Sequence, residues 1–303
     1  MRVTPKITIN TFIRNIHQQA SDILKAQQQI ASQKRINKIS DDPIGMGQVL
    51  GYRAKIATIE QYKDNINQGI SQLESNELTM DFASDLVSTA QKMAENYSGA
   101  GVTPEEKKLV AQQIKNLYEQ LESLANSKFN NNYVFAGHAT DTAPFSHDAD
   151  YNATYHGDDG QMRLMVGENV EINIDADGRN IFQNAANGGV NLFDQLKNLI
   201  DGLENADPVA GSAQIQATVS PLYEARQQIN DRRAEYAPAL YRLQYTGEYW
   251  DNLKPKVQDA LAETEQADIA QTALELQNLE VAYETTLATA ASIIQTSLMD
   301  FLK

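Results

Sequence analysis

Three histidines recur at intervals of nine residues near the middle of the chain. His138, His147 and His156 lie among several aspartates, and both residue types bind divalent metals. The aspartates are Asp141, Asp148, Asp150, Asp158 and Asp159. Zinc needs three or four ligands that converge at about 2 Å, and a nine-residue spacing across strands and turns does not guarantee convergence. We therefore predict solvated turn residues and no metal site, with zinc as the alternative.

A second possible cation site overlaps the first. Asp148, Asp150 and Asn152 alternate as in a calcium-binding loop, with Asp159 at the twelfth place. However, Ala153 stands where such a loop needs glycine for its sharp turn, and the next residues have the pattern of a strand. Calcium is therefore a less favoured alternative.

Motifs for catalysis are absent from the sequence. It contains no glycine-rich phosphate loop, no G-x-S-x-G turn and no H-E-x-x-H pair. We predict that the chain is not an enzyme and holds no cofactor. An enzyme of unknown type stays the least favoured alternative.

Composition narrows the class of protein further. The 303 residues include no cysteine and carry a formal net charge of −15, with 42% hydrophobic residues. This excludes disulfides and thiolate metal sites, and it argues against nucleic-acid binding, which needs a basic face. No run of about 18 apolar residues predicts a membrane helix, and the N-terminus does not have the pattern of a cleaved signal peptide. We expect a cytoplasmic protein, or one exported without a cleaved leader.

The first helix should carry a narrow apolar seam. Ile9, Ile16, Ile23 and Ile30 are seven residues apart, and Ile13 begins the companion seam, as in a coiled coil. The pattern runs to about residue 36. Asp42 and Pro43 then suit the N-cap and the first position of the next helix.

Two further helices and a small β insertion should follow. Heptads predict a helix over residues 43–97, and Thr103 with Glu106 forms a capping box for a third helix. Alternation and turn residues then predict strands at residues 133–137, 151–156, 162–166 and 170–174.

Helical periodicity returns in the last third of the chain. Helices are expected over residues 191–203, 213–253 and 265–301, with Pro238 kinking or interrupting the second. The last helix carries two seams, formed by Ile269, Leu276, Tyr283 and Ala290, and by Ala273, Leu287, Ile294 and Phe301.

The two ends of the chain carry opposite charge. Residues 1–40 hold seven basic residues and one acid, whereas residues 264–303 hold six acids and one basic residue. Opposite charges beside heptad seams favour pairing of these ends, which we expect to be antiparallel. A single narrow seam buries little surface, so this pair should be marginal alone and become ordered when many copies stack.

Residues 30–44 read IASQKRINKISDDPI. This segment resembles the N-terminal hallmark of the bacterial flagellin superfamily at Arg35, Ile36, Asn37, Asp41, Asp42 and Pro43. Residues 132–137 (NYVFAG) and 295–302 (QTSLMDFL) are similar to the branch of that family found at the junction of hook and filament. Gln33 stands where the family usually has glycine, which bears on where the first helix ends.

The resemblance implies a fold that is mainly α with a small β insertion. Its stacked discontinuous domains would be a terminal coiled-coil pair (residues 1–42 with 264–303), a long-helix bundle (residues 43–136 with 186–263) and an outer β domain (residues 137–185). Combined with the seams, it places assembly contacts on the terminal helices. The residues expected to make these assembly contacts are Ile9, Ile13, Ile16, Ile23, Ile30, Leu276, Tyr283, Leu287, Ile294 and Phe301.

The resemblance also implies a function. The chain would be an extracellular structural component of the flagellum, exported unfolded without a cleaved signal peptide, that joins hook to filament. Expected partners are a helical ring of its own copies, hook-associated protein 1 on the hook side, flagellin or the cap on the filament side, and an export chaperone at the C-terminal helix. Nucleic acid and membrane are not expected partners. The alternatives are a short flagellin that forms the filament itself and a cytoplasmic coiled-coil binding module.

Overall fold

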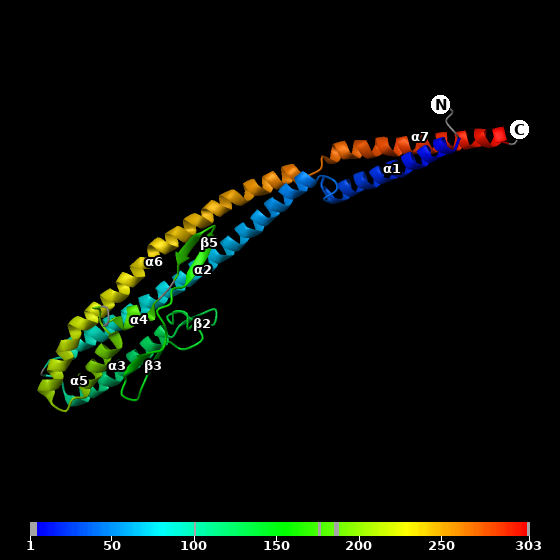
Figure 1. Cartoon of the computed structure of the whole chain (residues 1–303). Coiled ribbons are helices and arrows are strands. Elements are labelled where there is room, and N and C mark those ends of the chain that lie inside the picture. Colours follow the sequence, from blue (N-terminus) through cyan, green and yellow to red (C-terminus); the bar gives the residue numbers. More distant parts are fainter. Residues whose placement is uncertain (1–4, 100, 175–176, 185–187, 302–303) are drawn as a thin grey trace. The chain divides into compact units, whose positions relative to one another are not determined.

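A computed structural model describes residues 5–99, 101–174, 177–184 and 188–301 (Figure 1). The chain divides into two compact units. The terminal unit comprises Met1–Ile59 with Asn252–Lys303, and the central unit comprises Glu60–Asp251. Two long helices, α2 (Pro43–Tyr97) and α6 (Pro208–Glu265), contribute to both units. The three-domain division expected from the sequence stays a prediction.

The terminal unit is built mainly from two antiparallel helices. α1 (Pro5–Ser32) and α7 (Ile269–Phe301) lie side by side, with the start of α1 beside the end of α7 (Figure 1). The expected end of α1 near residue 36 is wrong, because Gln33 adopts a left-handed backbone with φ 59° and terminates the helix. α2 begins at Pro43 as predicted, with the Asp42 carboxylate accepting a hydrogen bond from the Gly45 amide at 2.9 Å.

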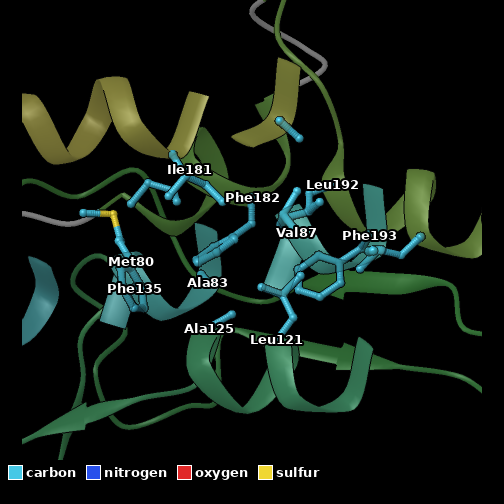
Figure 2. Close-up of a cluster of buried hydrophobic side chains, with 14 of the residues drawn as sticks. Met80, Ala83, Val87, Leu121, Ala125, Phe135, Ile181, Phe182, Leu192 and Phe193 are labelled. Atoms are coloured by element: carbon cyan, nitrogen blue, oxygen red, sulfur yellow. The ribbon is translucent and has the colours of Figure 1, made fainter. Parts of the chain in front are cut away.

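The central unit packs helices around one apolar core. Its helices are α3 (Pro104–Ala125), α4 (Gly178–Phe182), α5 (Leu192–Glu204) and the inner parts of α2 and α6. The predicted capping box is confirmed, since Thr103 and Glu106 bond reciprocally at the start of α3. Side chains from α2, α3, α4, α5 and the segment after β2 meet in this core (Figure 2). They include Met80, Val87, Leu121, Phe135, Phe182 and Phe193.

Three small antiparallel hairpins make up the β insertion. β1 (Lys128–Phe129) pairs with β2 (Asn132–Tyr133), β3 (Phe145–His147) with β4 (Ala153–Tyr155), and β5 (Arg163–Gly167) with β6 (Val170–Asn173). The last two strands lie where the alternation predicted them. A strand over residues 133–137 is wrong beyond Tyr133, because the chain turns there and Gly137 adopts φ 66°.

The long return helix is not interrupted at Pro238. Residues 208–265 form one continuous helix through Pro238, so the expected interruption is wrong. Proline removes a single ladder hydrogen bond, whereas neighbours such as Tyr236 and Leu243 are buried and hold the helix on both sides. Among the described residues, no helix is long and apolar enough to cross a membrane.

Candidate assembly interface

The two ends of the chain meet at a short backbone junction in the terminal unit. The Arg35 amide donates to the Glu265 carbonyl at 2.7 Å, and the Ala267 amide donates to the Gln33 carbonyl at 3.1 Å. Lys34 and Gln266 form an isolated antiparallel bridge between these bonds. The end of α1 is thereby joined to the segment that leads from α6 into α7.

A buried carboxylate lies at this junction. The Glu265 side chain is only 8% exposed and pairs with Lys34 at 2.8 Å and with Arg53. Both cations are roughly half exposed, so a largely desolvated anion is neutralised from the solvent side. Glu265 is the first acid within the acidic residues 264–303, and no local sequence signal marks it as the one that is buried.

The residues of the sequence hallmark build the same junction. The Arg35 guanidinium donates to the Thr264 carbonyl at 3.1 Å and pairs with Asp42 at 3.3 Å. Ile36 is 2% exposed, and the Asn37 side-chain amide donates to the Lys34 carbonyl at 2.9 Å. These contacts fix the path of the chain between α1 and α2.

Two aspartates complete the loop. Asp41 accepts hydrogen bonds from the Asn37 and Lys38 amides and pairs with Lys25 at 3.3 Å. Burial raises the pKa of Asp41, but these hydrogen bonds and the Lys25 cation outweigh it and hold the pKa below its ordinary 3.8. The Gly45 amide and Arg35 likewise lower the pKa of Asp42.

The predicted seam of α1 is only partly buried in the single chain. Ile16, Ile23 and Ile30 are half-buried, whereas Ile13 is 48% exposed. Ile9 lies in α1, but its side chain is outside the described part of the structure.

The predicted seam of α7 is also only partly buried in the single chain. Leu276 and Tyr283 are half-buried, and Leu287 is 41% exposed. Ile294 and Phe301 lie in α7, with side chains outside the description. The assignment of these ten seam residues to assembly stays a prediction.

Other apolar side chains of the terminal helices are more exposed than the seam. Leu24 in α1 is 65% exposed, and Leu274 and Val281 in α7 are 63% and 56% exposed. Leu274 and Val281 are seven residues apart and therefore share one face of α7. Buried Thr272 is two residues from Leu274, about 200° around the helix, so this face points away from α1. This outer face lies outside the predicted seams.

Each of the three central histidines contacts a different residue. His147 pairs with Glu122, the His156 ring nitrogen lies 2.8 Å from the Ser146 hydroxyl, and the His138 ring nitrogen lies 3.2 Å from the Gln161 carbonyl. Across the described ranges, no group of three or more histidine, aspartate or glutamate residues is placed to hold a metal ion.

The possible calcium loop is a hydrogen-bonded turn. The Asp148 carboxylate accepts from the Asp150 and Asn152 amides and from the Asn152 side chain at 2.8 to 2.9 Å.

Comparison with known proteins agrees with this architecture. Residues 5–140 match the model of the bacterial flagellin N-terminal helical region. The chain is 24% identical over 261 residues to flagellar hook-associated protein 3 of Escherichia coli, covering 80% of this chain and 81% of that protein. The chain is therefore similar to flagellar hook-associated protein 3 over most of its length. The matched region includes the whole hallmark, residues 30–44, whereas residues 264–267 on the other side of the junction lie outside it.

A solved structure and a second relative complete the comparison. A putative flagellar hook-associated protein from Vibrio parahaemolyticus has the same fold, with TM-score 0.68 and 19% identity over 75% of this chain and all of that one. Flagellin B of Helicobacter pylori is 27% identical over 117 residues, which cover 38% of this chain and 23% of that protein. The predicted flagellin-like, mainly helical fold with a small β insertion is thereby confirmed.

Proposed function

We propose that this chain is a non-enzymatic structural component of the bacterial flagellum that joins hook to filament. The observation that carries the proposal is the exposed apolar surface of the terminal helices. α1 and α7 are tied together at the Glu265 junction, yet Leu24, Leu274 and Val281 remain more than half exposed. Such surface on neighbouring helices is typical of an interaction site, and copies of the same unit are the partner that family resemblance supplies.

Charge explains why the terminal pair is weak on its own. Lys34 and Glu265 form an ion pair at one end of the helix pair. Among the described side chains, it is the ion pair that joins residues 5–42 to residues 264–292. The other charges along α1 and α7 are solvated and add little stability. In the proposed mechanism, copies stack into a helical ring, and the terminal helices gain order from their neighbours.

The partners follow from this role. In the proposed assembly the ring adds to hook-associated protein 1 on the hook side and presents a surface to flagellin or the cap on the filament side. A cytoplasmic chaperone would hold the C-terminal helix before export, which needs no cleaved leader. The resemblance supports these partners.

A charge placed in the seam tests the assembly role. In a strain that lacks the native gene, Ile16→Asp or Leu287→Asp should abolish motility and attached filaments, because a carboxylate cannot be buried there without a partner. Gln28→Asp is the matched control, since Gln28 is an exposed polar residue of the same helix. Wild-type motility in the Ile16→Asp strain would contradict the proposal.

A deletion strain separates this role from the alternatives. Loss of a junction protein leaves hooks without filaments and monomeric flagellin in the medium, whereas loss of a short flagellin leaves no filament protein outside. A cytoplasmic binding module would be absent from the culture supernatant. The extensive match to hook-associated protein 3, against a short match to flagellin B, favours the junction role.

A further inference from the structure

A lysine is buried near the start of α3. Lys107 is only 6% exposed, although lysine is rarely buried unless an acid pairs with it. It lies seven residues before Ile114 and fourteen before Leu121, and both of these are buried in the core of the central unit. A cation therefore occupies a position at which the heptad of α3 predicts an apolar residue.

The ammonium of Lys107 has no acid to neutralise it. Among the described residues, its one hydrogen-bond acceptor is the Ser212 hydroxyl of α6, at 3.1 Å, and no carboxylate pairs with it. An ammonium carries three donor hydrogens and a full charge, and both become costly to leave without a partner when water is excluded. The fold thus leaves a buried cation that a bound anion would stabilise.

A cavity of about 540 Å³ lies beside this lysine. It is formed in the central unit by the start of α3, the end of α5 and the start of α6. Besides Lys107, its lining includes the apolar residues Val102, Pro104, Leu203, Ala206 and Pro208. A cavity of this volume, with apolar walls and few polar groups, is typical of a site for a small ligand.

Three residues of the cavity lining are charged. Lys107 and Lys108 are cations, and Glu204 is an anion that already pairs with Lys115 at 2.6 Å. Lys108 and Glu204 are exposed, whereas Lys107 is buried. Because water and salt screen the two exposed charges, the ammonium of Lys107 has the largest effect on a ligand inside the cavity.

Other carboxylates near these helix starts lie outside the cavity lining. Glu106 belongs to the capping box of α3, and Asp207 accepts hydrogen bonds from two backbone amides at the start of α6. Glu105 is exposed in the first turn of α3. These three acids therefore do not supply the partner that Lys107 lacks.

We propose that this cavity binds a small organic acid with a short apolar chain. The carboxylate would accept the remaining hydrogens of the Lys107 ammonium and neutralise its charge. The chain would lie against the apolar walls, such as Leu203 and Pro104, and replace water there. A free acid suits the cavity better than an acidic side chain of a neighbouring protein, because one aspartate or glutamate would fill only a small part of its volume.

Titration calorimetry of the purified full chain with sodium hexanoate tests the site. Hexanoate should bind saturably with a Kd of about 1 mM or lower, whereas hexanol and hexylamine should give no saturable heat. Lys107→Met should abolish binding, and Lys92→Met should not change it, because Lys92 is exposed on α2 and lies outside the cavity. Absence of saturation by about 20 mM hexanoate, or equal affinity in Lys107→Met, would overturn the proposal.

A second variant blocks the cavity without changing the lysine, and it decides the question if Lys107→Met does not fold. Ala206 is exposed and lines the cavity, so Ala206→Trp should weaken hexanoate binding about tenfold or more while circular dichroism stays that of the wild type. Ala217→Trp is the matched control, at an exposed alanine of α6 outside the cavity. Equal affinity in the two variants would show that hexanoate binds elsewhere and would overturn the cavity as the site.

Filament attachment distinguishes a free acid from a carboxylate of another protein chain. In a strain that lacks the native gene, Lys107→Met should leave the number of attached filaments as in the wild type, because the ligand is a free acid. A several-fold loss of filaments with a folded Lys107→Met protein would show that a neighbouring chain supplies the carboxylate. That result would overturn the assignment of a small-molecule ligand.

Discussion

The ammonium of Lys34 lies 2.8 Å from the carboxylate of Glu265, although the two residues come from opposite ends of the sequence. The Arg35 amide and the Glu265 carbonyl bond beside this pair, so charge and backbone contacts coincide. The ion pair and the backbone hydrogen bond together fix where the antiparallel pairing of α1 and α7 begins. The junction is therefore where single substitutions should affect the terminal unit most.

Removing the charge of Glu265 should loosen this junction. In Glu265→Gln, Lys34 and Arg53 lose their shared carboxylate, at a cost of about 1.4 kcal/mol, which corresponds to about tenfold faster hydrogen exchange of the Arg35 amide. Glu263→Gln is the control, because Glu263 lies two residues earlier in α6 and is exposed. Equal exchange in the two variants would show that the ion pairs do not stabilise the junction.

Glycine at position 33 should stabilise the terminal unit. Gln33 holds φ at 59° with its side chain exposed, so Gln33→Gly removes the steric cost of a left-handed residue. We expect a gain of about 0.5–1 kcal/mol in the free energy of unfolding, part of the benefit being offset by the flexibility of unfolded glycine. Gln33→Ala keeps the β-carbon and should gain nothing. Identical urea unfolding of the two variants would contradict this interpretation.

Acid should weaken the loop before α2. The pKa of Asp41 is lower in the folded protein than its ordinary 3.8, so its contribution is present above that value and is lost as the pH falls through the folded pKa. Asp41→Asn should therefore be less stable than the wild type at about pH 7, and the difference should shrink toward zero near about pH 2. Denaturant unfolding across this range measures it, with exposed Asp259→Asn as the control.

Truncating a core aromatic should destabilise the central unit strongly. Phe193 is fully buried among Phe145, Phe182 and Tyr118, so Phe193→Ala should cost about 3–5 kcal/mol. Phe82→Ala should change stability by less than about 0.5 kcal/mol, because Phe82 is 54% exposed. Thermal unfolding that ranks the two variants in the opposite order would contradict this placement of the core.

Protease should cut the monomer first in its terminal helices. Among the described residues of α1 and α7, Ala26 and Thr272 are buried while many apolar neighbours are exposed, so these helices open locally at low cost. Brief digestion should trim both ends and leave a fragment that contains residues 60–251. Mass spectrometry of the fragments identifies the sites, and resistant ends would show that the pair is stable without neighbours.

Helix positions were predictable where the signals are local. Pro43 begins α2 and Thr103 caps the start of α3 as predicted, because a proline at the first turn and a capping box act within a few residues. The ends of the strands were less predictable. Gly137 turns the chain early, and its backbone contacts Asp158, which no local pattern reveals.

The junction could be predicted only in part. The opposite charges of the two ends indicated that they meet, but Glu265 is buried only because α6 ends beside Lys34 and Arg53. Likewise the heptads marked apolar positions without revealing which remain exposed, because exposure depends on how far α1 covers α7. Leu274 and Val281 lie outside the expected seams and were missed for that reason.

The terminal unit is made from two stretches separated by the whole central unit, Glu60–Asp251. The intervening stretch is contiguous and has its own core, so it can collapse as soon as its last helix is available. The isoleucines of α1, by contrast, have no partner until α7 emerges, and closing so long a loop is slow and costly in entropy. The connectivity therefore favours one order of folding. The central unit folds first, and the terminal unit folds last, because its two stretches lie at the two ends of the chain.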